Sequence, residues 1–304
     1  MRIRIGTRAS VLALWQAEHV RDLLAPQGHE VEIHKMTTTG DKVLDRRLES
    51  IGGKGAFLKE IEEALLAGQV DLAVHSLKDV PTALPQGLML CAYLERADAR
   101  DALLSNSGRR LESLPPGTRV GTSSLRRSSQ VKAMRPDLHV DDLRGNVDTR
   151  IRRLRERHYD AILLAMAGLV RLGRTSEVTQ VLDPGVFVPA PGQGTIVLEC
   201  RQDDEAVRAA AGRLHHEPTA QVVRTERTFL AALEGGCNVP LGAHATFEGG
   251  RFHLRAFVAR YDGSAVLRGE DSGPDPDALG KRVAAASACS CPSPTAPSTP
   301  WRVA

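Results

Sequence analysis

The sequence predicts an α/β protein built from two similar halves and a smaller C-terminal domain. Two observations predict this fold class. Strand-like and helix-like stretches alternate twice, first within residues 2–94 and again within residues 119–173. The last segment, residues 242–270, alternates apolar and polar residues in three runs, which is typical of a small antiparallel sheet.

Composition and charge are those of an ordinary globular protein. The 304 residues suffice for two or three domains, and 42% hydrophobic with 25% charged residues is a usual balance. Aromatic residues make up only 4%, so aliphatic residues must build the cores. The net charge of +3 is small, but most cations are arginines, whose planar fork binds carboxylates and phosphates with paired hydrogen bonds.

The cysteines and the N-terminus indicate the cellular setting. An odd number of cysteines, with no paired metal-ligand spacing, argues against a disulfide framework or a zinc site: Cys91, Cys200, Cys237, Cys289 and Cys291. No apolar run reaches membrane-spanning length, and residues 1–6 resemble a strand rather than a signal peptide. We therefore expect a reducing, cytoplasmic setting.

The first half opens with a strand, a turn and a helix. Residues 2–5 predict a short strand, and residues 6–10 a polar turn that contains a glycine. Ser10 is placed to cap a helix over residues 11–24. The beginning of a helix that follows a strand commonly binds an anion, although a plain turn between strand and helix is the alternative.

A glycine-rich loop and a strand end are the next candidate ligand sites. Residues 51–57 contain glycines that let the backbone approach a ligand, and Lys54 adds a positive charge, but the spacing is not that of a Walker A phosphate loop. Residues 70–74 predict a buried strand, and Lys78 and Asp79 lie just beyond it, where open α/β sheets bind ligands. An ordinary surface ion pair is the alternative for these two residues.

The second half repeats this order, with arginines at the strand ends. The polar segment 95–101 is interpreted as a crossing between domains, and residues 119–127 run from a strand through a Gly-Thr-Ser-Ser turn into a helix. Arg126 and Arg127 fall in the first helical turn, where the helix dipole disfavours cations. Two arginines at this place indicate that an anion joins them.

Two further strands of this half also lead to arginines. Residues 139–143 are followed by Arg144 and Arg150, and residues 159–165 by Arg171. Because these arginines arrive separately at one edge of a sheet, we expect an anion site there rather than a solvated face. Nucleic-acid binding is the alternative, but aromatic stacking platforms and known binding motifs are missing.

The chain then returns to the first half before a cysteine loop. Residues 195–200 predict an isolated strand after the stiff link 189–194, so we expect the chain to cross back into the first domain. A helix over residues 225–233 precedes the loop 234–242, in which glycines stand just before Cys237. Taken alone, the loop favours a cysteine that fills a gap under a turn; the arginines favour a thiol that a large ligand can reach.

Seven segments in order resemble the porphobilinogen deaminase family, also called the hydroxymethylbilane synthases. Each is a modest signal alone, but together they form a specific match that extends from residue 2 to about residue 282. They are Arg8-Ala-Ser10 with Leu12-Ala-Leu-Trp-Gln16, Gly52-Gly-Lys-Gly55, Asp71 through Pro81, Gly121-Thr-Ser-Ser-Leu-Arg-Arg127, Leu143-Arg-Gly-Asn-Val147, Pro191-Gly-Gln-Gly194 and Glu234-Gly-Gly-Cys237.

The resemblance implies a fold and its domain boundaries. Family members have two periplasmic-binding-protein-like, doubly wound α/β domains around a cleft, plus a small C-terminal α+β domain. We therefore expect a discontinuous first domain at residues 1–96 and 195–216 and a second, which binds substrate carboxylates, at residues 101–190. A third domain at residues 217–282 would carry the cysteine loop.

The resemblance also implies an activity. It predicts a transferase of haem-type tetrapyrrole biosynthesis that joins four porphobilinogen molecules head to tail, releases ammonia, and ends with water to give hydroxymethylbilane. A dipyrromethane cofactor, made from substrate, would be attached to Cys237 by a thioether. Porphobilinogen is the expected partner, with no nucleic acid, membrane or metal, and the family implies a monomer.

Roles for single residues follow from the same resemblance. Asp79 is the expected catalytic carboxylate, because a carboxylate beside the pyrrole N–H groups can stabilise the azafulvenium-like cation left by loss of ammonia and assist proton transfer. The residues expected to bind the cofactor are Cys237, Lys78, Asp79, Arg126, Arg127, Ser124, Arg144 and Gly145. Those expected to bind the substrate, chiefly through its acetate and propionate groups, are Arg8, Ser10, Lys54, Phe57, Arg144, Arg150 and Arg171.

The C-terminus departs from the family pattern. From Ala284 the composition changes to Ser, Pro, Ala and Thr, and the prolines from Pro292 to Pro300 cannot sustain the amphipathic helix expected there. We interpret residues 283–304 as an atypical tail that is disordered or results from a shifted reading frame near codon 284. Resequencing that finds one uninterrupted frame would remove the second explanation.

Three other functions would use the same features differently. A non-enzymatic, two-lobed anion- or solute-binding protein predicts a signal peptide or lipid anchor and needs no special cysteine. A nucleic-acid-binding protein predicts binding that weakens steeply with salt and does not depend on Cys237. A thiol enzyme would use Cys237 as a nucleophile with His244 or His253 as the base, although no spacing favours either histidine.

Overall fold

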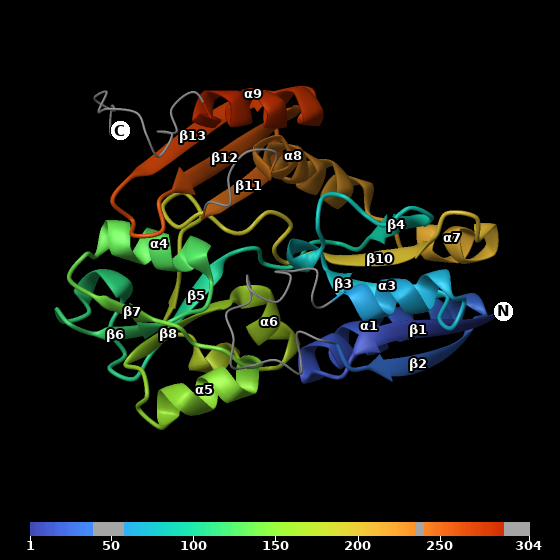
Figure 1. The fold of residues 1–304 in the computed structure, drawn as a ribbon, viewed down its shortest axis with the longest axis horizontal. Helices are drawn as coiled ribbons and strands as arrows, with labels where there is room; N and C mark the ends of the chain where they lie inside the picture. The colour runs from blue at the N-terminus through green and yellow to red at the C-terminus, as the bar shows by residue number, and fades with distance from the viewer. Residues whose placement is uncertain (39–57, 235–239, 289–304) are drawn as a thin grey trace.

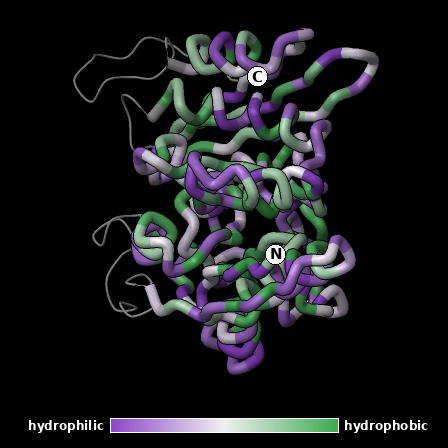
Figure 2. The backbone as a smooth tube through the Cα atoms, turned by 90° about the vertical axis from the view of Figure 1, so that its right-hand side faces the viewer, coloured by the Kyte–Doolittle hydropathy of each residue, from purple (hydrophilic) through white to green (hydrophobic). Residues whose placement is uncertain are grey.

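The computed structural model describes residues 1–38, 58–234 and 240–288. It confirms the predicted fold class, with two five-stranded mixed sheets and a third, three-stranded sheet. Figure 1 shows the two larger sheets on either side of the molecule, with the C-terminal residues 217–288 lying across one end of both. Hydrophobic and hydrophilic stretches alternate along the backbone within single elements (Figure 2), as expected when each element buries one face.

The first sheet is formed by β1 (Arg2–Arg8), β2 (Glu30–Met36), β3 (Leu72–Ser76), β4 (Leu88–Tyr93) and β10 (Ile196–Arg201). Its strand order is β2-β1-β3-β10-β4. Strands β2 and β3 run parallel to β1, whereas β10 is antiparallel to both of its neighbours. Strand β10 therefore brings the chain back into this sheet after the second sheet is complete.

Three helices accompany this sheet: α1 (Val11–Leu24), α3 (Lys59–Leu66) and α7 (Glu205–Gly212). Helix α1 starts where the sequence predicts, because the Ser10 hydroxyl accepts a hydrogen bond from the Ala13 backbone N–H at 3.3 Å. Its fully buried apolar side chains recur at helical spacing and pack against the sheet: Ala17, Val20 and Leu24.

The second sheet is formed by β5 (Asp101–Ser105), β6 (Arg119–Gly121), β7 (His139–Asp141), β8 (Ala161–Ala165) and β9 (Gln180–Val181). The strand order is β7-β6-β8-β5-β9, and β7 and β8 run parallel to β6. Each of these three parallel strands leads into a helix: α4 (Leu125–Met134), α5 (Val147–Arg155) and α6 (Met166–Arg171). The helices therefore begin at one edge of the sheet.

The C-terminal part packs two helices on an antiparallel sheet. It consists of α8 (Glu217–Glu234), β11 (Leu241–Glu248), β12 (Arg251–Ala259), β13 (Val266–Gly273) and α9 (Pro276–Ala288). Phe229 from α8 and Leu279 from α9 are fully buried against Leu254 of the sheet. None of the helices in the described ranges is both long and apolar enough to span a lipid bilayer.

The structure differs from the sequence prediction at several elements. Strands β5 and β9 were not expected, because their pairing partners are distant in sequence and the two residues of β9 carry no periodic signal. Helix α8 begins at Glu217, well before residue 225. Helix α9 continues to Ala288, so residues 283–288 are not part of an irregular tail; Val283 and Ala284 lie in the hydrophobic core, and the prolines begin only later in the chain.

A buried ion pair joins the C-terminal part to both segments that link the two larger sheets, residues 95–101 and the returning link, residues 189–194. The Glu226 side chain on α8 has no solvent exposure and accepts hydrogen bonds from Arg96 Nη1 at 2.7 Å and Nη2 at 3.2 Å. It also accepts the backbone N–H groups of Gly192 at 2.6 Å and Ala245 at 2.8 Å. One carboxylate thus fixes α8, β11 and both links.

Replacing Glu226 tests this junction. Glu226→Ala should lower the free energy of unfolding by about 3–5 kcal/mol, because it leaves the Arg96 guanidinium buried without its partner. The matched control is Glu217→Ala on the same helix, whose side chain is 65% exposed, and it should change stability by less than about 0.5 kcal/mol. Urea unfolding measures both, and equal values for the two variants would contradict the assignment.

Candidate active site

The candidate residues lie where strands of the two larger sheets end. In the first sheet, Arg8 ends β1, and Lys78 and Asp79 form a short 3₁₀ turn directly after β3. In the second sheet, the residues follow the carboxyl ends of the three parallel strands β6, β7 and β8: Ser124, Arg126, Arg127, Arg144, Gly145, Arg150 and Arg171. Ends of this kind are the usual ligand sites of open α/β sheets.

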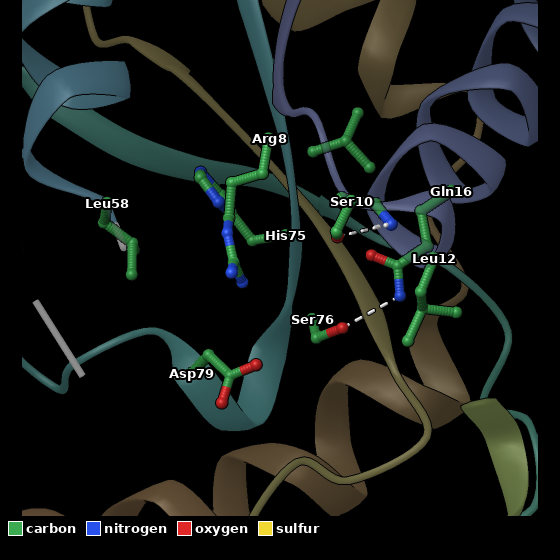
Figure 3. A pocket seen from close by; sticks show the side chains of 10 residues that line it. Arg8, Ser10, Leu12, Gln16, Leu58, His75, Ser76 and Asp79 are labelled. Carbon is green, nitrogen blue, oxygen red and sulfur yellow. Dashed lines mark hydrogen bonds between the residues drawn. The ribbon is translucent and has the colours of Figure 1, made fainter. Parts of the chain in front are cut away.

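A small cavity of about 90 Å³ lies at the end of β3. Figure 3 shows the Arg8 guanidinium extending from β1 toward the side of the cavity on which the Asp79 carboxylate lies. The Ser10 side chain also borders this space while it caps α1, and Gln16 Nε2 donates to Ser76 Oγ at 2.8 Å. The cavity therefore combines one carboxylate with a guanidinium and several polar side chains.

Lys78 is a cation in an environment that disfavours its charge. Its pKa is lowered to about 8, chiefly by burial; Asp79 opposes the shift, and the positive charge of Arg127 adds to it. The lysine thus lies within electrostatic reach of residues from both sheets. A ligand carboxylate at this place would favour the charged form of the amine.

The anion predicted between Arg126 and Arg127 is a carboxylate of the chain itself. Asp101 is fully buried and accepts hydrogen bonds from both guanidiniums at 2.6–3.1 Å. Gln193 Nε2 donates a further bond to it at 3.0 Å. Burial alone would raise the pKa of Asp101, but the two guanidiniums outweigh it and hold that pKa well below the usual range.

This pairing changes what the two arginines can contribute to a ligand. Two guanidiniums face one carboxylate, so one positive charge remains in surplus.

Ser124 caps the same helix, since its hydroxyl accepts the Arg127 backbone N–H at 3.4 Å. In the sequence Asp101 closes the polar segment 95–101, which does not reveal its pairing with the two arginines; the available signal is an acidic residue directly before the apolar residues of β5.

Arg150 connects the second sheet electrostatically to Asp79. Its pKa is lowered to about 10, first by burial and then by the charge of Arg127, with Asp142 and Asp79 opposing the shift. Arg150 Nε donates to the Gly145 backbone oxygen at 2.7 Å. Gly145 has φ +113°, and a Cβ there would meet Thr149 at 2.8 Å, so the turn requires glycine.

Arg144 and Arg171, which are also predicted to bind ligand carboxylates, lie in different environments. The Arg144 charge contributes to lowering the pKa of Arg150, so these two cations are neighbours. Arg171 Nη2 donates to the Gly194 backbone oxygen at 2.7 Å, and its guanidinium lies 5.9 Å from the centre of the Trp15 ring. Burial lowers the pKa of Arg171 to about 10. Arg171 therefore bridges the second sheet to α1 and to the returning link.

Three of the predicted site residues, Lys54, Phe57 and Cys237, lie outside the described residues. His244, considered as a base for the thiol, is on β11, and its pKa is lowered by burial. Within the described ranges no cluster of His, Cys, Asp and Glu could hold a metal ion.

Taken together, the described residues bring several cations and one carboxylate to strand ends of the two larger sheets. Lys78 and Arg150 are desolvated cations that carboxylates would stabilise, and Arg126 with Arg127 adds a surplus charge. Asp79 is the carboxylate that lines the cavity, together with the cation Arg8. Such an arrangement can hold several carboxylates and stabilise a cation at one point.

Comparison with known proteins gives two family matches along the chain. The profile described as "Porphobilinogen deaminase, dipyromethane cofactor binding domain" matches residues 3–209, and the profile described as "Porphobilinogen deaminase, C-terminal domain" matches residues 220–287. The second match includes nearly all of α9.

Individual relatives are similar over nearly the whole chain. A porphobilinogen deaminase of Geobacter sulfurreducens is 51% identical over 278 residues, which is 91% of this chain and 87% of the relative. Those of Pelobacter propionicus and Oceanobacillus iheyensis are 50% and 48% identical, cover 90% and 93% of this chain, and are themselves covered to 88% and 93%. Among solved structures, the periplasmic VFT2 domain of Bordetella pertussis BvgS has 12% identity and a TM-score of 0.42, and the match covers 70% of this chain and 86% of that one.

Replacing Asp101 tests the charge arrangement. Asp101→Asn should lower the free energy of unfolding by about 3–5 kcal/mol at neutral pH, because two buried guanidiniums lose their counter-ion. The folded-state pKa of Asp101 lies below its unfolded value, so its contribution is complete above about pH 4 and is lost as the pH falls below that value.

The difference between wild type and Asp101→Asn should therefore shrink below about pH 4 in chemical unfolding experiments. Asp137→Asn, which affects an exposed pair with Arg135, is the control and should cost less than about 1 kcal/mol. A pH-independent difference would show that the Asp101 charge is not the source of the stabilisation.

Proposed function

Because the chain belongs to the porphobilinogen deaminase family, we propose that the cavity beside β3 is the catalytic centre of this enzyme of tetrapyrrole synthesis. The proposed reaction is the stepwise head-to-tail condensation of four porphobilinogen molecules with loss of ammonia, followed by hydrolysis to hydroxymethylbilane. This is a group transfer, so the enzyme is a transferase that acts as a hydroxymethylbilane synthase.

One observation carries the proposal. Asp79 shares a cavity with Arg8, and its charge acts on both Lys78 and Arg150, which come from different sheets. The substrate has two carboxylates on each pyrrole ring, and its reaction passes through a cation. A single carboxylate among converging cations meets both requirements, because the cations bind the acids and the carboxylate stabilises the reacting centre.

Asp79 is proposed as the catalytic carboxylate. Loss of ammonia from porphobilinogen leaves a positive charge delocalised over the methylene carbon and the ring nitrogen. An ionised carboxylate held near that nitrogen lowers the energy of this cation without moving during the step. The surrounding cations orient the substrate through its acid groups.

The residues present fit a dipyrromethane cofactor. Lys78 and Arg150 have lowered pKa values because they are desolvated and close to other cations. Carboxylates of a ligand would offset both effects, because they stabilise the charged forms of the two side chains. We assign Lys78, Ser124, Arg126, Arg127, Arg144 and Gly145 to hold the cofactor and Cys237 to carry it covalently. When bound, the cofactor supplies the free ring carbon to which the first substrate unit is joined.

Substrate contacts are proposed for a second group of residues. Arg8 and Ser10 border the cavity beside Asp79, which favours contact with an incoming acetate or propionate. We assign the same role to Arg150 and Arg171, with Arg144 shared between cofactor and substrate. Lys54 and Phe57 complete the proposal from the glycine-rich loop.

The domain division and the setting are also proposals. Residues 1–96 with 195–216, residues 101–190 and residues 217–288 each contain one sheet, which supports three domains meeting at the links that Glu226 joins. We propose a monomeric enzyme of the cytoplasm that acts on porphobilinogen.

Replacing Asp79 tests the catalytic assignment. Asp79→Asn keeps the shape of the side chain but removes its charge, so porphobilinogen consumption should fall by at least about 100-fold, and Asp79→Ala should fall at least as far. Circular dichroism and thermal unfolding should remain those of the wild type. The control Asp203→Asn alters an exposed carboxylate and should retain full turnover; near-normal product formation by Asp79→Asn would refute the assignment.

A further inference from the structure

A buried glutamate and a histidine form a pair at the wall of the catalytic cavity. His75 on β3 and Glu199 on β10 approach at 3.0 Å between Nε2 and Oε2, and their side chains are 6% and 0% exposed. His75 faces Val197 across the antiparallel strands, and Glu199 lies two residues further along β10. Both side chains therefore point to the same face of the sheet.

Apolar side chains could fill this part of the sheet without a buried ionisable pair. Glu199 Oε1 is buried and has no hydrogen-bond partner among the residues that the structure describes. A buried carboxylate with a single partner is destabilising compared with apolar side chains of similar volume. The neighbouring Val197, Leu58 and Leu77 show that apolar residues fill this face of the sheet.

The histidine of this pair also borders the cavity of the candidate site. His75 lines the same cavity as Asp79 and Arg8 and precedes Asp79 by one short turn (Figure 3). Glu199 is fully buried on the neighbouring strand and does not line the cavity. A carboxylate that holds an imidazole at a cavity wall is the arrangement found where histidine transfers protons.

Other titratable groups around Glu199 come from two further elements. The pKa of Glu62 on α3 is raised by burial and by the charge of Glu199, and is lowered in part by His75. The Glu199 charge also contributes to a raised pKa of Cys91 on β4. Glu62 is half-buried, so these carboxyl groups connect the pair toward the surface of α3.

We propose that His75 accepts the proton that the pyrrole ring carbon loses in each condensation, and that Glu199 orients the imidazole and balances the charge it gains. This inference rests on the proposed function. It separates two tasks: the Asp79 side chain stabilises the cation, while the His75 imidazole removes the proton. One side chain therefore need not perform both tasks in the same step.

The step balances in atoms and electrons. The carbon–nitrogen bond of porphobilinogen breaks, and its electron pair leaves with ammonia. An electron pair of the free ring carbon of the growing chain then forms the new carbon–carbon bond. The carbon–hydrogen bond at that ring carbon breaks, its electron pair restores the aromatic ring, and the proton passes to His75. The imidazolium returns this proton to ammonia or to water, so no oxidant or reductant is needed.

The test compares His75→Ala and His75→Gln with wild type and with His158→Ala, whose exposed imidazole lies outside the cavity. Intact mass first establishes that each purified protein carries its two-pyrrole adduct, and thermal unfolding establishes that it is folded. Turnover of porphobilinogen by both His75 variants should then fall by about 10²–10⁴-fold. Added imidazole should restore activity to His75→Ala but have no effect on wild type or His158→Ala.

Glu199→Gln keeps the size of the side chain but removes its charge, so its turnover should lie between those of wild type and His75→Ala. Wild-type turnover by either loaded His75 variant would overturn the proposal, as would a loss in His75→Ala that imidazole does not restore. Wild type that carries no adduct and consumes no porphobilinogen would instead contradict the proposed function itself. His75→Gln keeps the test decisive if the alanine variant does not fold.

Discussion

The contact between Asp101 and the two arginines of α4 is the constraint on which the candidate site depends. Two guanidiniums buried side by side repel each other, and both would be desolvated without compensation. Asp101 removes this conflict and draws in Gln193, so β5, α4 and the returning link meet at one carboxylate. The remaining positive charge then lies near Lys78, whose pKa is lowered chiefly by burial and further by the charges of Arg127 and Arg126.

The carboxylates of this protein fall into two kinds: those that the fold itself pairs, and those that remain available to a ligand. Glu226 and Asp101 lie where separate elements of the fold meet, and each accepts several hydrogen bonds from donors of the chain. Asp79 differs, because it borders a cavity together with Arg8. The site thus has more cations than carboxylates, which suits a substrate that brings two carboxylates with every ring.

Local features could be predicted from the sequence, whereas partners distant along the chain could not. Ser10 as a helix cap, the strand ends that carry Asp79 and Arg126, and the antiparallel C-terminal sheet all follow from spacing and residue type. Asp101 pairs with Arg126 across 25 residues, and His75 with Glu199 across 124, and no local pattern specifies either contact. Helix α9 continues through residues that looked irregular, because Val283 and Ala284 still present an apolar face to the core.

We propose that the cations at these strand ends bind the carboxylates of a pyrrole cofactor anchored at Cys237. The most direct measurement is the intact mass of the purified, denatured protein. The wild type should carry an adduct of two pyrrole units that is absent from Cys237→Ser, and this variant should also be inactive. A wild-type chain that is fully active at its unmodified mass would contradict this proposal.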